Sequence, residues 1–497
     1  MALSDPDLRR PRGWALLTWE RPRPELIRTR PWAWRLAVAT VCFGAFMGQL
    51  DASIVTLTYQ SLRNQFHTPL AAVQWVSLAY MLALVALLIP VGRLSDAHGR
   101  KLVYLYGFAL FTAASAACGL APTLGVLIVF RVVQAAGAAM LQANSVALVT
   151  TSAPPGRMRA ALGMQAAGQA IGLALGPTVG GALVDTIGWR WVFGINVPIG
   201  IVAVIAGHYL LPRTRQRSGG NRIDLPGVAL LTASTTALLL ALSVASGLGL
   251  PQWATAALLA LSVAAGWAFV RRQARCANPL VDLKLVRGGG IAPGLFGGLC
   301  GYLVLFGPLV LVPVGLARQG IGALQSGLVL TALPVGFAVA ATLADRLLPS
   351  GWGNRARARA GTLGCVLALA LMALLPLREA LLPAPLALLG LALGVFLPAN
   401  NTAVMRAIPA AASGTGGGMV NMTRGLGTAL GVAAVTLTLH LVPGRAGIAT
   451  AFAVLAAFAV LAWTTVARRG GGTAAGTTPG NGAGNAVGGG PGRSPAH

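Results

Sequence analysis

The feature that most constrains this chain is a series of long apolar runs separated by short, arginine-rich loops. Each run has about 20 residues, enough for an α-helix to cross about 30 Å of hydrocarbon. The repetition of such runs predicts an all-α membrane protein with fourteen transmembrane helices. The runs lie at residues 33–57, 71–91, 102–120, 123–149, 160–183, 191–211, 224–245, 252–271, 289–314, 322–344, 359–376, 383–404, 412–437 and 446–466.

The basic residues set the orientation of these runs. The net charge is +26, from 37 Lys and Arg against 11 Asp and Glu. Arginine collects in the N-terminal segment and in every second loop, which is typical of cytoplasmic loops and not of one nucleic-acid-binding patch. We therefore expect no nucleic-acid partner, and both termini on the cytoplasmic side of the plasma membrane. The seven opposite loops hold only Arg63, Arg190, Arg318, Arg378 and Arg445.

An internal repeat divides the chain. The segment Gly163–Gly176 aligns without gaps with Gly418–Gly431, and Leu141–Val149 aligns with Leu397–Met405 at nearly the same offset. A looser echo of the sequence around Asp96 occurs around Asp345. Parallel repeats of this kind occur in secondary transporters, whose substrate site lies between the two halves near the middle of the membrane.

The repeat predicts five regions. Two six-helix halves are separated by a linker with two extra spans, and the tail is rich in glycine and alanine, which predicts disorder. The regions are a cytoplasmic basic segment (1–32), the N-terminal half (33–211), the linker with its spans (212–288), the C-terminal half (289–466) and a disordered cytoplasmic tail (467–497).

Two opposite charges are predicted inside the membrane. Asp51, in the stretch "MGQLDASIV", is the only acidic residue well inside any predicted span, and Arg131 lies inside the fourth span. At 1.5 Å per residue, Asp51 lies roughly 9 Å and Arg131 roughly 12 Å from the outer ends of their helices. An intramembrane charge is costly unless it is paired or faces a cavity. We therefore expect Asp51 and Arg131 to form a pair.

Further polar residues in the spans are candidates for a substrate cavity. Interhelical hydrogen bonds are the alternative for most of them, and hydrogen bonds to backbone carbonyls are the alternative for Arg424. Tyr80, near the start of the second span, is expected to anchor the membrane interface. The cavity candidates are Gln134, Gln142, Asn144, Asn400, Asn421 and Arg424.

Two motifs are rich in glycine. In "GRLSDAHGRK" (Gly92–Lys101), Gly92 allows close helix approach, and Asp96 can bind a helix N-terminus or pair with Arg100. Simple anchoring of the loop by positive charge is the alternative. In "GLALGPTVGG" (Gly172–Gly181), glycines four apart make a smooth helix face around a proline that can bend the helix. Ordinary packing of small residues is the alternative there.

These motifs resemble those of the major facilitator superfamily, in particular its fourteen-span drug:H⁺ antiporters. "GRLSDAHGRK" is similar to the family's loop signature after span two, and "GLALGPTVGG" to the span-five signature of exporters. "LDASIV" (Leu50–Val55) is similar to the span-one signature. "RVVQAAGAA" (Arg131–Ala139) resembles the span-four signature, except that Ala135 stands where glycine is usual. The resemblance covers residues 33–466 and implies the major facilitator fold.

The resemblance implies a proton-coupled exporter of a small lipophilic or amphipathic substrate, which works by alternating access. Asp51 and Arg131 would couple proton movement to transport. A proton-coupled importer in the same fold is the alternative. We expect a functional monomer among membrane lipids, with no cofactor, no bound metal and no enzymatic activity. The residues assigned to conformational gating are Gly92, Asp96, Gly99, Arg100, Lys101, Gly172, Gly176, Pro177, Gly180 and Gly181.

Overall fold

The computed structural model describes residues 20–468 apart from 21, 29, 215–223, 246–250, 252, 288–289, 322, 350, 376–377 and 443. Most of the predicted N-terminal segment, and the tail beyond residue 468, lie outside the described residues. Where it is described, the chain is almost entirely helical.

Each of the fourteen predicted runs contains a helix. The first half has α2 (Ala33–Ile54), α4 (Leu70–His98), α5 (Arg100–Gly119), α6 (Leu124–Ser152), α7 (Met158–Thr186), α8 (Arg190–Gly194) and α9 (Asn196–Leu210). Two helices follow, α10 (Leu225–Ala245) and α11 (Trp253–Gln273). The second half has α13 (Ile291–Ala317), α14 (Ala323–Leu347), α15 (Asn354–Leu374), α16 (Pro383–Ala407), α17 (Ser413–Leu441) and α18 (Gly444–Arg468).

Length and hydropathy support membrane crossing. Among the described residues, 13 helical segments are long and apolar enough to span a bilayer, with α8 and α9 counted as one. The remaining long helix, α7, has 29 residues and lies between α2 and α14. Its sequence is rich in glycine, which suits close packing more than contact with lipid.

The structure differs from the prediction at two places. The first span ends at Ile54 instead of residue 57, and a 3-10 turn (Val55–Thr58) leads into an unpredicted polar helix, α3 (Tyr59–Phe66). The sixth span is interrupted at Ile195, between α8 and α9. Pro198 explains this break, because it has no N–H to donate to the carbonyl one turn earlier.

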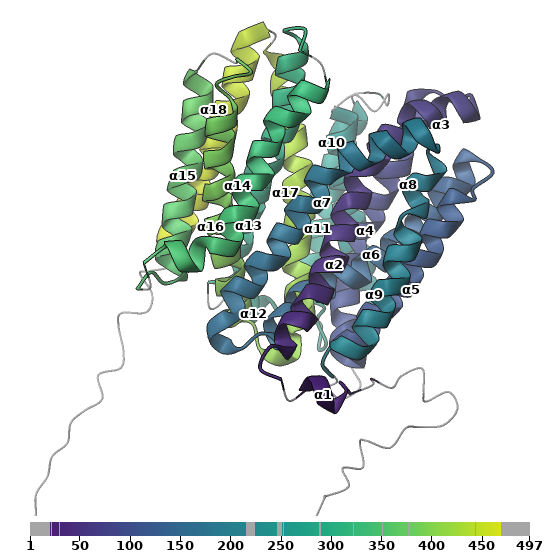
Figure 1. Ribbon diagram of the computed structural model, residues 1–497, viewed down its shortest axis with the longest axis vertical. Helices are drawn as coiled ribbons and strands as arrows, with labels where there is room; N and C mark the ends of the chain where they lie inside the picture. The colour runs from purple at the N-terminus through teal and green to yellow at the C-terminus, as the bar shows by residue number, and fades with distance from the viewer. Residues whose placement is uncertain are drawn as a thin grey trace, which may run out of the picture.

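The helices form two groups that lie side by side (Figure 1). The groups meet mainly where α4 packs on α17, α6 on α17, and α7 on α14. The short helices α1 (Glu25–Arg28) and α12 (Leu283–Arg287) lie at one end of the bundle, where α4 and α14 end and α7 and α17 begin. We call this the basic end, because the arginine-rich loops lie there.

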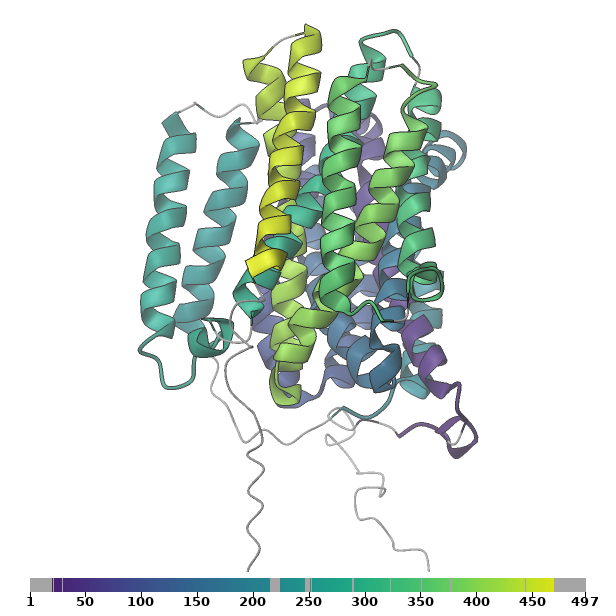
Figure 2. The same ribbon diagram turned by 90° about the vertical axis from the view of Figure 1, so that its left-hand side faces the viewer.

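The inserted helices form a separate pair at the side of the bundle (Figure 2). α10 packs on α11 and also contacts α4 and α17, so it lies beside the junction of the two halves. α11 exposes large apolar side chains, among them Trp253, Val263 and Trp267, which suits contact with lipid. At the basic end Asp224 accepts hydrogen bonds from Arg272 and Gln273 of α11. The bond from Arg272 holds the pKa of Asp224 below its ordinary value.

Candidate functional site

Asp51 on α2 is fully buried and accepts hydrogen bonds at both carboxylate oxygens. Its Oδ2 accepts from Arg131 Nη1 of α6 at 2.7 Å. Its Oδ1 accepts from Gln134 Nε2 at 3.0 Å and from Asn196 Nδ2 of α9 at 2.9 Å. The carboxylate therefore has one cationic donor and two amide donors.

Arg131 is held from several sides as well. Its Nη1 also donates to Gln134 Oε1 at 2.6 Å, and its Nε donates to the carbonyl of Val76 on α4 at 3.1 Å. Its Cζ lies 4.0 Å from the ring centre of Tyr80, within range of a cation–π contact. The buried pair thus joins α2, α4, α6 and α9 of the first half.

The predicted contact between Asp51 and Arg131 is confirmed. Gln134, assigned to the substrate cavity, is instead fully buried against Asp51 and Arg131. Tyr80 is only 1% exposed, so its assignment as an interface anchor is wrong. Sequence reasoning also missed Asn196, although an amide inside an otherwise apolar run was the signal that could have identified it.

The motif Gly92–Lys101 contacts the second half at the basic end. Asp96 accepts from the backbone N–H groups of Gly414 and Thr415, each at 2.8 Å, and from Thr415 Oγ1 at 2.7 Å. These donors lie in the first turn of α17, where a carboxylate also interacts favourably with the helix dipole. A Cβ at Gly92 would lie 2.6 Å from the carbonyl of Gly414, so a larger residue would force the helices apart.

Arg100 completes this contact. Its Nε and Nη2 donate to Asp96 Oδ1 at 3.1 and 3.0 Å, and its Nη2 also donates to the carbonyl of Ala410 at 2.6 Å. We call Gly92, Asp96 and Arg100, with Gly414 and Thr415, the latch. Both predicted interactions of Asp96, with a helix N-terminus and with Arg100, are present.

The other two motif residues act within the first half. Gly99 has φ 104°, which favours glycine and allows the sharp turn from α4 into α5. The Nζ of Lys101 donates to the carbonyls of His208 and Leu211, at 2.9 and 2.8 Å, at the C-terminal end of α9. The structure therefore places Lys101 away from the contact with α17.

A related contact occurs where the repeat predicts an echo. Asp345 at the end of α14 accepts from Arg159 Nε, at the start of α7, at 2.6 Å, and from Arg357 Nη1 at 2.5 Å. Arg159 Nη1 also donates to Asn354 Oδ1 at 2.9 Å. Each half therefore offers the carboxylate at the end of one helix to the start of a helix in the other half.

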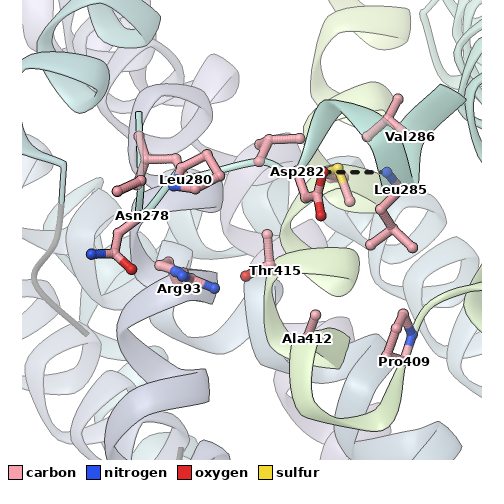
Figure 3. A pocket seen from close by; sticks show the side chains of 13 residues that line it. Arg93, Asn278, Leu280, Asp282, Leu285, Val286, Pro409, Ala412 and Thr415 are labelled. Carbon is pink, nitrogen blue, oxygen red and sulfur yellow. Dashed lines mark hydrogen bonds between the residues drawn. The ribbon is translucent and has the colours of Figure 1, made fainter. Parts of the chain in front are cut away.

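A cavity of about 290 Å³ lies beside the latch, between α4, α17 and the segment that links α11 to α12. Figure 3 shows Arg93, Thr415 and Asp282 around this cavity. The linking segment is fixed there, because Leu280 and Val281 are buried. The segment between α11 and α12 thus covers part of the latch at the basic end.

The second glycine motif packs α7 against α2. A Cβ at Gly172 would lie 2.5 Å from the carbonyl of Phe46, and one at Gly180 would lie 2.5 Å from Ile54 Cγ1. A Cβ at Gly176 would overlap Ser53 Oγ, whereas none of these close contacts occurs at Gly181. The predicted smooth face is therefore confirmed for three of the glycines. Helix α7 runs through position 177, and the bend at Pro177 stays a prediction.

Gly176→Leu is expected to destabilise the protein by about 1–3 kcal/mol, the usual cost of overpacking. Its side chain would push Ser53, which is fixed by a hydrogen bond to the carbonyl of Gln49, and would thereby displace the helix that carries Asp51. The measurement is the thermal unfolding midpoint of the purified protein. Gly181→Ala is the control, because a Cβ there has open space. An unchanged midpoint for Gly176→Leu would contradict the packing argument.

Three of the cavity candidates come together between the halves. Arg424 of α17 donates through Nη2 to Gln142 Oε1 of α6, and Asn421 Nδ2 donates to the carbonyl of Gln142 at 2.7 Å. Gln134 contacts Asp51, as described above, and the remaining two candidates, Asn144 and Asn400, lie elsewhere. Asn144 Nδ2 donates to Met140 of its own helix, and Asn400 Nδ2 donates to Gly294 of α13.

A second cavity, of about 400 Å³, lies between α4, α10 and α17 toward the end opposite the latch. We call it the α10 cavity. Its lining is mostly apolar and carries no charged residue. The lining residues are Tyr59, Gln74, Ser77, Leu78, Met81, Val85, Leu239, Leu242, Ser243, Gly425, Thr428, Ala429, Val432 and Ala433.

Several known proteins resemble this chain in sequence. The Tetracenomycin C resistance and export protein of Streptomyces glaucescens is 32% identical over 330 residues, 65% of this chain and 61% of that protein. The multidrug resistance protein Stp of Mycobacterium tuberculosis is 31% identical over 80% of this chain and 74% of its own. The riboflavin transporter RibZ of Clostridioides difficile is 30% identical over 80% of this chain and 86% of its own.

The fold has a solved counterpart, the human organic anion transporter MFSD10. It superposes with a TM-score of 0.65 at 17% identity, over 88% of this chain and 100% of that one. The family model described as Major Facilitator Superfamily matches residues 41–432. Its members are transporters and not enzymes, and their substrates are small molecules. This multi-pass membrane protein therefore belongs to the major facilitator superfamily, as its sequence motifs indicated.

Proposed function

We propose that the protein is a proton-driven exporter of small lipophilic or amphipathic compounds, such as antibiotics. The observation that carries this proposal is the buried pair of Asp51 and Arg131. An acidic residue inside a membrane span is a functional site by default, because burying it there is costly. One relative is named as a resistance and export protein for tetracenomycin C, and Stp is named as a multidrug resistance protein. The methylenomycin A resistance protein of Streptomyces coelicolor, 30% identical over 81% of this chain and 85% of its own, is named for resistance to an antibiotic. These names support drug export.

The proposed cycle alternates between two states. With the basic end taken as cytoplasmic, the latch closes the cytoplasmic side, and Asp51 is ionised against Arg131. A proton from outside would neutralise Asp51 and weaken its bond to Arg131. The first-half helices joined by this pair would then rearrange, the latch would open, and substrate would bind as the proton leaves to the cytoplasm. Such coupling requires that the proton and the substrate each bind the two states with different affinities.

Everted membrane vesicles test the direction of transport. Vesicles energised by respiration are expected to accumulate at least one compound from a panel of tetracenomycin C, methylenomycin A and riboflavin, and a protonophore should abolish this uptake. The control is vesicles that lack the protein. Uptake of the panel only by right-side-out vesicles would instead support the alternative, a proton-coupled importer, and would contradict export.

A further inference from the structure

We infer that Arg424, together with Gln142, binds a negatively charged group of the substrate, which makes the transported compound an amphipathic organic anion. This inference rests on the proposed transport function and names its substrate class. The anionic group would be a carboxylate or an ionised phenol on a mostly apolar body.

Arg424 is a buried cation without a counter-ion among the described residues. Four arginines among the described residues are almost fully buried: Arg100, Arg131, Arg357 and Arg424. The first three each form an ion pair with an aspartate. Within the described part of the chain, Arg424 has no carboxylate within ion-pair distance, and the one hydrogen bond of its side chain goes to the neutral Gln142. A buried cation without a counter-ion is strongly unfavourable, so an anion that binds there is stabilised.

Several hydrogen-bond donors around Arg424 have no protein partner among the described residues. Only one N–H of Arg424 has a protein partner in the described residues, and the amide nitrogen of Gln142 has none there. The hydroxyl of Tyr80 is buried and also lacks a partner among them, and Tyr80 interacts electrostatically with Arg424. These groups provide donors in excess of acceptors, which is the arrangement that a carboxylate requires.

Arg424 and Gln142 lie deep in the helix bundle, where the two halves meet. Arg424 is eleven residues into α17, and Gln142 is ten residues before the end of α6, so both lie roughly 15 Å from the basic end. This depth is close to the middle of the membrane, at the junction of the halves. Arg424 is 6% and Gln142 is 8% exposed, in contrast to Arg131 at 1%. Arg424 and Gln142 therefore retain some accessible surface, whereas Arg131 is almost completely buried.

A cavity lies along the part of α17 that follows Arg424. The α10 cavity is lined by Gly425 and Thr428, which lie next to Arg424 and one turn after it on α17. Arg424 and Gln142 do not themselves line this cavity. The volume of about 400 Å³ is in the range of sites for drug-sized ligands. Its uncharged lining suits the apolar body of the compound, while Arg424 binds the charged group.

The test measures binding to the full-length protein purified in detergent. The probes are 4-(1-pyrenyl)butanoate, its neutral amide and the corresponding primary amine, which share one apolar body. Affinity is obtained from the rise of the thermal unfolding midpoint with probe concentration. The wild-type protein is expected to bind the carboxylate most tightly. Arg424→Gln should weaken carboxylate binding about tenfold to a hundredfold and leave amide binding within about threefold.

Two further variants serve as controls for the effect of Arg424→Gln. Arg63→Gln removes a positive charge from exposed α3 and should leave all three affinities unchanged, and Arg424→Lys should retain part of the preference for the carboxylate. Without probe, Arg424→Gln should unfold no earlier than the wild type, because it removes an uncompensated charge. Equal wild-type affinity for carboxylate and amide, or unchanged carboxylate binding in Arg424→Gln, would overturn the inference. Binding in detergent needs no proton gradient. A negative binding result therefore overturns the assigned substrate class only, and proton-driven export is tested by the vesicle measurement.

Discussion

Asp51→Asn is expected to reduce pH-driven substrate accumulation in everted vesicles at least tenfold, to the level of vesicles without the protein. Asparagine has nearly the same shape as aspartate but cannot take up and release a proton. It also leaves Arg131 buried without its counter-ion, although Gln134 and Asn196 can still donate to the remaining oxygen. The measurement is uptake of the compound from the panel that wild-type vesicles accumulate.

A second variant separates loss of coupling from loss of folding. Breaking a buried ion pair by removing one partner costs about 3–5 kcal/mol, so Asp51→Asn alone is expected to lower the unfolding midpoint. The double variant Asp51→Asn/Arg131→Gln removes both charges and should recover much of that stability. Its pH-driven accumulation should stay absent. Accumulation at the wild-type level by the double variant would contradict the role of Asp51.

Asp96→Asn is expected to open the latch and to reduce the transport rate several-fold while the protein stays in the membrane. Asp96 accepts three hydrogen bonds from Gly414 and Thr415, and each bond to a charged group contributes about 1.5–3 kcal/mol. Asparagine is uncharged and offers only one acceptor oxygen. The contact with the first turn of α17 would weaken, and the state that is open at the basic end would become more populated.

Thiol accessibility measures this opening. Ser413, the first residue of α17, is buried beside the latch, and Ser413→Cys in a variant without the native cysteines provides one reactive site. A membrane-impermeant thiol reagent applied at the basic end should react faster when Asp96→Asn is also present. Glu379→Gln is the control, since Glu379 lies in the loop between α15 and α16, at the end opposite the latch. Equal reaction rates with and without Asp96→Asn would contradict the latch.

Much of this architecture was predictable, because lipid imposes strong constraints on sequence. Every spanning helix needs its own apolar run, so the fourteen runs identified the helices. An intramembrane charge needs a partner, so the matching depths of Asp51 and Arg131 predicted their contact. The spacing of Gly172, Gly176 and Gly180 likewise predicted the face of α7 that packs closely on another helix.

Other features depended on contacts that spacing does not encode. Asn196 reaches Asp51 through the packing of α9 on α2, which a one-dimensional hydropathy pattern does not predict. Lys101 lies in a loop motif, yet it binds the end of α9. The depth of Gln134 was predictable, but the direction of its amide toward Asp51 follows from the packing of α2 against α6.

In the proposed function, Asp51 carries the proton that drives export. The most direct measurement is proton movement in proteoliposomes that contain an internal pH indicator, when the compound accumulated by wild-type vesicles is added on one side without an imposed pH gradient. Wild-type protein should move protons opposite to the compound, and Asp51→Asn should carry the compound without moving protons. Proton movement at the wild-type rate through Asp51→Asn would contradict the proposed role of Asp51.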